Sequence, residues 1–356
     1  MRWQNLVICL FIAACLLLVT VGKTQDLATH ESAAEGISFD PLFGTVIATS
    51  PNVVAWTRFD LDRSKIGREE PVYHSKCFIQ HLGAKPVLVS RGGFSRGGDE
   101  PAVILPDDTL LVWRLDPIHQ FDSLLWLHGG AIQRQVPLKI DGAAPSVRAI
   151  FPDGIVAESR RDIWWVPILD GHVNVLEKKK MGNGGCSELS RFKNQIVWAN
   201  NKIWPSGSEQ GKPIKAPLYI FDMTLETTAA VNLRGSRHQM PYDVLAFDGR
   251  HVFDGQAVIE VPSGQTRELD HFFDAIGIID NVVYCVERKY DAFELQAMHL
   301  DRPDRRDVIR RIVKSALSPK RPSAADTIPV KTLFFVEGDA LYAWNGTTWE
   351  NVLAKR

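Results

Sequence analysis

The sequence predicts an all-β fold built from seven copies of a four-stranded unit. Residues 147–175 show the unit most clearly, because they hold four short β-type runs, VRAIF, IVAES, DIWWVPIL and HVNV. The runs are separated by Pro152-Asp153-Gly154, Arg160-Arg161 and Asp170-Gly171, which interrupt the apolar pattern at the points where turns are expected. The first half of this unit, an apolar run, a tight turn and a second apolar run, then recurs along the chain.

Seven copies of this strand–turn–strand pattern can be counted. They begin at Thr45, Ala102, Arg148, Leu189, Val244, Ala275 and Leu333. The units that contain them are expected to start at Gly44, Pro101, Ser146, Cys186, Asp243, Asp274 and Lys331. The distances between these starts bracket the roughly 40 to 50 residues that a four-stranded repeat occupies.

The seven units resemble the β-propeller superfamily over residues 36–356, although they lack the marks of the WD, kelch and quinoprotein propellers. The resemblance implies a seven-bladed β-propeller in one domain. It also implies that the loops entering each innermost strand, and those joining second and third strands, share one face around the central channel. Ligands of propellers usually meet that face.

The strands of the individual units can be assigned in order. The first unit contains TVIATSP, VVAWTRF, PVYHSKCFIQ and PVLVS, and the second AVILP, TLLVWRL, DSLLWLH and IQRQVPL. The fourth unit has its longest insertion at residues 204–217, between its second and third strands. The sixth unit ends in a basic stretch, residues 301–322, which is interpreted as a solvated connector with an amphipathic turn of helix.

The seventh unit is one strand short. It holds LFFVEGD, ALYAWNG and TWENVLA, and the sequence ends at Arg356. Residues 36–40 (GISFD) are predicted to supply the missing outer strand, which would close the ring and leave no open sheet edge.

The N-terminal residues 1–22 predict export, because Arg2 is followed by an apolar run from Leu6 to Gly22. The run suits a cleavable signal peptide, an uncleaved anchor, or a lipidation signal at Ile12–Cys15. Residues 23–35 are polar and are interpreted as a linker. All three alternatives place the propeller outside the cytoplasm, in contact with a membrane only through an uncleaved N-terminal segment.

Composition and the absence of known motifs argue against nucleic-acid binding and against several enzyme classes. With 41 basic and 42 acidic residues, the chain has no global attraction for nucleic acid, and no aromatic residues interleave with the arginines of residues 301–322. There is no HExxH or calcium loop. RGGFSRGG at 91–98 contains the letters GxSxG at 93–97, but no helix pattern follows as a nucleophile elbow requires, and the stretch lacks the Lys-Ser/Thr ending of a phosphate loop. No cofactor or metal is therefore expected.

The cysteines do not form a disulfide framework. Cys77, Cys186 and Cys285 lie outside the N-terminal apolar run, and their wide separation favours buried thiols over one long-range disulfide with a leftover thiol.

The candidate site lies on the face that the resemblance assigns to ligands. Loops between second and third strands would present Arg160, Arg161 and residues 287–291, and the ligand-binding candidates are Arg148, Glu188, His238, Tyr242, Asp243, His271, Asp274, Arg288 and Tyr290. Glu188, Asp243 and Asp274 are expected to place three carboxylates on one arc, with His238 and His271 beside them. Tyr242 and Tyr290 would offer flat surfaces for sugar rings. The alternative is that Arg148 and Arg288 pair with these carboxylates.

Three function classes remain. The first is a non-enzymatic module that binds a protein or glycan partner outside the cytoplasm. The second is a carbohydrate-active enzyme that uses acidic residues at the channel mouth as acid and base. The third is a structural component without a small ligand. The sequence favours the first.

Overall fold

The computed structural model describes residues 44–50, 53–61, 73–81, 84–92, 102–114, 123–128, 131–186, 189–199, 218–234, 246–313, 334–344 and 349–355. The chain divides into two compact units, residues 1–38 and residues 39–356, and all of the described residues belong to the second. The predicted N-terminal apolar run, the linker and the closing strand at residues 36–40 all lie outside the described residues. Within the described ranges, no helix has the length and apolar character needed to cross a membrane.

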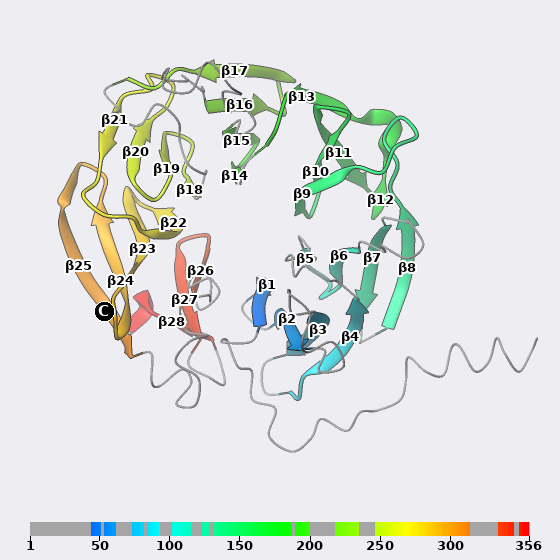
Figure 1. The fold of residues 1–356 in the computed structure, drawn as a ribbon, viewed down its shortest axis with the longest axis horizontal. Helices are drawn as coiled ribbons and strands as arrows, with labels where there is room; N and C mark the ends of the chain where they lie inside the picture. The colour runs from blue at the N-terminus through cyan, green and yellow to red at the C-terminus, as the bar shows by residue number, and fades with distance from the viewer. Residues whose placement is uncertain are drawn as a thin grey trace, which may run out of the picture. The chain divides into compact units, whose positions relative to one another are not determined.

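Residues 39–356 form a seven-bladed β-propeller, as the sequence predicts. Seven antiparallel sheets follow one another in chain order around a ring, with the first strand of each sheet innermost (Figure 1). Blade 1 contains β1 (Gly44–Ser50), β2 (Val53–Leu61), β3 (Tyr73–His81) and β4 (Val87–Gly92). Blade 2 contains β5 (Ala102–Ile104), β6 (Leu110–Arg114), β7 (Ser123–His128) and β8 (Ala131–Pro137).

The later blades follow the same order. Blade 4 contains β14 (Leu189–Phe192), β15 (Gln195–Ala199), β16 (Leu218–Asp222) and β17 (Thr227–Val231). Blade 5 contains β18 (Ala246–Phe247), β19 (His251–Phe253), β20 (Ala257–Glu260) and β21 (Thr266–Glu268). Blade 6 contains β22 (Asp274–Ile279), β23 (Val282–Arg288), β24 (Ala292–His299) and β25 (Arg302–Val313). Blade 7 contains, among the described residues, β26 (Phe334–Glu337), β27 (Ala340–Trp344) and β28 (Trp349–Asn351).

Blade 3 corrects one expectation. Its first three strands are β9 (Ser146–Phe151), β10 (Gly154–Ser159) and β11 (Asp162–Leu169), as predicted. The predicted fourth run, HVNV, forms only the two-residue β12 (His172–Val173), followed by the 3-10 turn Val175–Glu177. The outer strand is β13 (Lys179–Asn183), which pairs with residues 162–165 of β11, whereas β12 pairs with its last two residues. Two short segments therefore share the outer edge of one long strand.

The interpretation of the basic stretch at the end of blade 6 is wrong. Residues 302–313 are not a solvated connector but β25, the outer strand of the blade, which pairs with β24 along its length. Half-buried Ile309 and Ile312, which are separated by two arginines, pack on the cluster between blades 6 and 7. An edge strand tolerates many arginines because its outer face is solvated.

Apolar clusters of described residues fill the spaces between successive blades and explain why the middle strands are so apolar. Every residue of β10 is buried, because both faces of the strand pack against neighbouring blades, whereas the outer strand β8 alternates between exposed and half-buried. One cluster closes the ring. In it, Val54 of blade 1 packs with Trp344 of blade 7, and Trp349 lies edge-on to Trp344 with ring centroids 5.1 Å apart.

Two of the cysteines lie deep in these clusters. Cys186 belongs to the cluster between blades 3 and 4, and Cys285 to the cluster between blades 5 and 6. Cys285 is a free thiol, and its burial raises its pKa to about 12. The prediction of a buried thiol is confirmed for Cys285, while the side chain of Cys77 lies outside the described residues.

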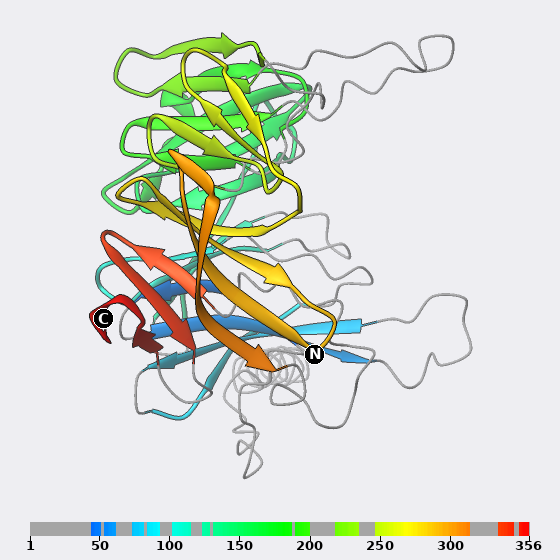
Figure 2. The ribbon, with the colours of Figure 1, turned by 90° about the vertical axis from the view of Figure 1, so that its left-hand side faces the viewer.

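The topology separates two faces of the propeller. Because the strands are antiparallel, the start of the first strand, the second–third turn and the end of the fourth strand lie at the same end of a blade. These ends together form one face of the propeller, here called the mouth face. The strands extend between the mouth face and the opposite face (Figure 2).

Candidate binding site on the mouth face

The structure describes five of the nine candidate residues. Arg148 lies on β9 of blade 3, and His271, Asp274, Arg288 and Tyr290 lie at the mouth end of blade 6. Glu188, His238, Tyr242 and Asp243 fall outside the described residues, so the proposed arc of three carboxylates stays a prediction.

The first charged pair at blade 6 joins Asp274 to Arg288. Asp274 begins β22 and Arg288 ends the neighbouring β23, so antiparallel pairing brings the two side chains together. Arg288 Nε donates to Asp274 Oδ2 at 2.6 Å and Nη2 to Oδ1 at 3.3 Å, a two-point contact that fixes the guanidinium. This is the alternative that the sequence left open for Arg288. Arg148, in contrast, pairs within blade 3, with Glu158 at 2.7 Å.

Two glutamates face each other across the strands of blade 6. Glu287 of β23 and Glu294 of β24 are direct partners in the register, and like charges in such positions repel. Gln296 Nε2 relieves this by donating to Glu287 Oε2 at 2.8 Å and to Glu294 Oε2 at 3.5 Å. Lys289 forms a salt bridge with Glu287, and Arg311 of β25 lies 3.8 Å from Glu294. The charges are therefore held in fixed positions.

The pKa of Glu287 shows whether the surrounding hydrogen bonds and charges stabilise the ionised carboxylate against the effect of burial. Burial, the largest single influence, would raise the pKa of Glu287. Hydrogen bonds from Lys289 and Gln296, together with electrostatic interactions with Lys289 and His271, outweigh burial and hold the pKa of Glu287 below its usual value. Glu287 is therefore ionised at neutral pH.

The variant Glu287→Gln is expected to show a pH-dependent loss of stability. The folded-state pKa lies below the unfolded value of about 4.3, so the carboxylate stabilises the fold above that pH. This contribution is lost as the pH falls through the folded-state pKa. Urea unfolding should show the two proteins differing at pH 7 and converging below about pH 4. Glu177→Gln, which changes an exposed glutamate of blade 3, is the control. A Glu287→Gln difference that grows on acidification would contradict the assignment.

Two exposed aromatic side chains lie within two residues of these charges in the sequence. Tyr290, at the tip of the turn between β23 and β24, is 99% exposed, and Phe272, in the connection from blade 5, is 51% exposed. The connection is fixed by backbone hydrogen bonds from Phe273 to Gly255 (2.8 Å) and from Leu269 to Gln256 (2.7 Å). Aromatic side chains are enriched at protein interfaces, where they act as anchors.

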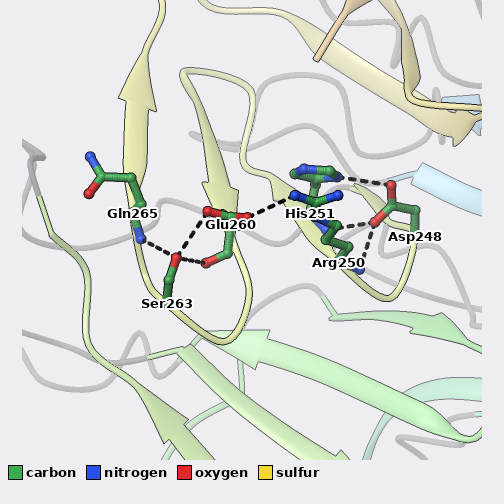
Figure 3. A network of polar contacts seen from close by, with 6 residues as sticks. All are labelled: Asp248, Arg250, His251, Glu260, Ser263 and Gln265. Atoms are coloured by element: carbon green, nitrogen blue, oxygen red, sulfur yellow. Dashed lines mark hydrogen bonds and ion pairs between the residues drawn. The ribbon is translucent and has the colours of Figure 1, made fainter. Parts of the chain in front are cut away.

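The polar network of blade 5 lies on the opposite face and has a structural role (Figure 3). Asp248 Oδ1 accepts the backbone N–H groups of Arg250 and His251, at 2.8 and 2.6 Å, which closes the turn between β18 and β19. Glu260 accepts from Arg250 Nη2 at 3.1 Å and from Ser263 Oγ at 3.2 Å. The network ties the first–second turn of the blade to its third–fourth turn.

Sequence reasoning missed Phe272, Glu294 and Gln296. Phe272 could have been noticed as the middle of the HFFD stretch that begins with His271. Glu294 and Gln296 become neighbours of Glu287 only through the β23–β24 register, which a sequence does not reveal. In the described ranges, no group of three or more His, Cys, Asp or Glu side chains is arranged to hold a metal ion.

Comparisons with known proteins return matches among solved structures. No protein-family model matches the chain, and no curated protein matches it. Among solved structures, the β-propeller domain of the Trilobed protease from Pyrococcus furiosus is similar at 11% identity and a TM-score of 0.49, covering 87% of this chain and 98% of that one.

Two peptidases are also similar in structure. Pyrococcus horikoshii acylaminoacyl peptidase matches at 12% identity and a TM-score of 0.48, over 89% of this chain and 54% of its own. A prolyl endopeptidase matches at 12% identity and a TM-score of 0.36, over 71% of this chain and 38% of its own. This chain thus spans about half of the acylaminoacyl peptidase chain and less of the endopeptidase chain.

Proposed function

We propose that this protein is an exported, non-enzymatic binding module that holds a protein or glycan partner on the mouth face of the propeller. The observation that carries the proposal is the exposure of Tyr290 and Phe272 beside fixed charged pairs. Aromatic side chains bury much apolar area at low entropic cost when a partner covers them. The fixed ion pairs around them offer directed polar contacts without having to be ordered on binding.

The acidic residues at blade 6 do not favour a glycosidase. A carboxyl group that acts as general acid needs a raised pKa so that it carries a proton at neutral pH. The pKa of Glu287 is instead lowered, and its carboxylate is occupied by Lys289 and Gln296. The ionised Glu287, held by Lys289 and Gln296, is suited to positioning a polar partner rather than to transferring a proton.

The double variant Tyr290→Ala/Phe272→Ala is expected to weaken partner binding about tenfold or more, because two exposed aromatic anchors are removed. Full-length protein should be applied to a glycan array and a peptide array, and the tightest ligand titrated against both forms. The control is Leu169→Ala/Leu225→Ala, which removes two exposed leucines at turns of the opposite face. Equal affinity of the aromatic variant and the parent, or turnover of a bound glycan, would contradict the proposal.

Export rests on the apolar run in residues 1–22. Residues 1–30 fused to a reporter that is active only after export should yield activity outside the cytoplasm. A reporter that stays inside and inactive would remove this part of the proposal.

A further inference from the structure

The turn between β10 and β11 of blade 3 has an unusual backbone for its residues. It consists of Arg160 and Arg161, with φ values of 52° and 76°. Both lie in the left-handed region, which costs a non-glycine residue roughly 1–2 kcal/mol and for which Asn-Gly or Asp-Gly is the preferred pair in such hairpins. Two of the two-residue turns on the opposite face follow that preference more closely, namely Asp170-Gly171 in blade 3 and Asp280-Asn281 in blade 6. Arginine thus occupies both positions of the turn against the local preference.

The fold itself gains little from these two arginines. Both are exposed, and among the described residues neither guanidinium has a hydrogen-bond or ion-pair partner. The carboxylates nearest in sequence are engaged elsewhere, Glu158 with Arg148 at 2.7 Å and Asp162 with Lys180 at 2.9 Å. Within the part of the chain that the structure describes, no carboxylate pairs with the two positive charges at the tip of this turn on the mouth face.

The scaffold under the turn is well defined. The strands β10 and β11 pair in continuous register up to Ser159 and Asp162, which flank the two arginines. The carbonyl of Arg161 accepts the N–H of Gly184 at 2.7 Å, and Ser159 is buried. Only the guanidinium ends are left to be ordered by a partner, which lowers the entropic cost of binding.

We propose that the Arg160–Arg161 turn binds carboxylates of an acidic segment of a protein partner. The inference rests on the proposed binding function and specifies its partner as a protein that carries Asp or Glu side chains. A guanidinium matches a carboxylate through two parallel N–H···O hydrogen bonds, and two adjacent guanidinium groups suit neighbouring acidic side chains. An anionic glycan fits less well, because the described part of blade 3 has no exposed aromatic side chain on which a sugar ring could stack.

The test uses the variant Arg160→Asn/Arg161→Gly, which installs the preferred turn pair. A labelled peptide of alternating glutamate and serine is titrated against the full chain by fluorescence anisotropy, with the glutamine–serine peptide and a sulfated oligosaccharide as further probes. We expect the acidic peptide to lose about tenfold or more in affinity, the loss of roughly one charge-assisted contact. The melting temperature should be unchanged or raised, because the strained backbone is relieved. A role in stability would instead lower it.

The control is Lys193→Asn, which removes a positive charge from a residue of positive φ in the β14–β15 turn on the opposite face. It should leave peptide binding unchanged. The inference fails if the acidic peptide binds parent and double variant equally, if the glutamine–serine peptide binds as tightly, or if only the sulfated oligosaccharide depends on the two arginines. In each of these cases binding through Tyr290 and Phe272 is untouched. If the arrays return no ligand for the full chain, the proposed function itself fails.

Discussion

Replacing Trp198 by alanine is expected to lower the free energy of unfolding by about 3–5 kcal/mol. Trp198 is 1% exposed and belongs to the cluster that joins blades 3 and 4, where it packs with Trp165 and Phe221. Its ring also stacks on Tyr219, with centroids 5.5 Å apart. Removing it leaves a large cavity between two sheets, and the sheets cannot collapse into the cavity without breaking the ring. Guanidinium unfolding followed by far-UV circular dichroism measures the loss.

The matched control is Leu176→Ala, since Leu176 is 97% exposed on the 3-10 turn of blade 3. It should unfold within about 0.5 kcal/mol of the parent. A small loss for Trp198→Ala, similar to that of the control, would mean that the inter-blade cluster does not hold the two sheets together as the structure indicates.

Gly264→Ala is expected to destabilise the fold by about 2–5 kcal/mol, for two separate reasons. Gly264 has a φ of +73°, which strains any other residue, and a Cβ atom added there would lie 2.0 Å from the backbone oxygen of Asn232. That oxygen belongs to the segment leaving blade 4. Backbone hydrogen bonds from Arg234 to Gly264 (2.7 Å) and from Thr266 to Arg234 (2.8 Å) prevent the two segments from moving apart.

Gly338→Ala separates the two causes. Gly338 also has a positive φ, +57°, but nothing lies within 4 Å of an added Cβ atom. Its substitution should cost only the backbone term, about 1–2 kcal/mol. If a thermal melt showed the same decrease in the free energy of unfolding for both variants, the close approach between blades 4 and 5 would not contribute to the cost of Gly264→Ala.

Much of the fold could be predicted because each blade carries its own turn chemistry. The predicted unit starts Gly44, Ser146 and Asp274 are the first residues of β1, β9 and β22. These positions follow from apolar periodicity and turn residues, which are local properties of the chain. The outer strands were harder to predict from the sequence. β25 is rich in arginine, and β13 has the sequence KKMGN, so neither has the apolar alternation of a half-buried strand.

The site was predicted only at the level of loops. The assignment of residues 287–291 to a second–third turn placed Tyr290 in the turn at the mouth end of blade 6, whereas Glu287 and Arg288 are the last two residues of β23. The pairing of Arg288 with Asp274, and the meeting of Glu287 with Gln296, depend on which residues face each other across two strands. A shift of one residue in that register would turn each side chain to the other face of the sheet, and nothing in the sequence alone fixes it.

The central claim, that a partner is held on the mouth face, is tested most directly by hydroxyl-radical footprinting of the full chain with and without its tightest arrayed ligand. Oxidation of Tyr290 and Phe272 should fall on binding, because both side chains are exposed in the unbound protein. Oxidation of Leu225, exposed on the opposite face, should not change. Protection of Leu225 with unaltered oxidation of Tyr290 and Phe272 would contradict the claim.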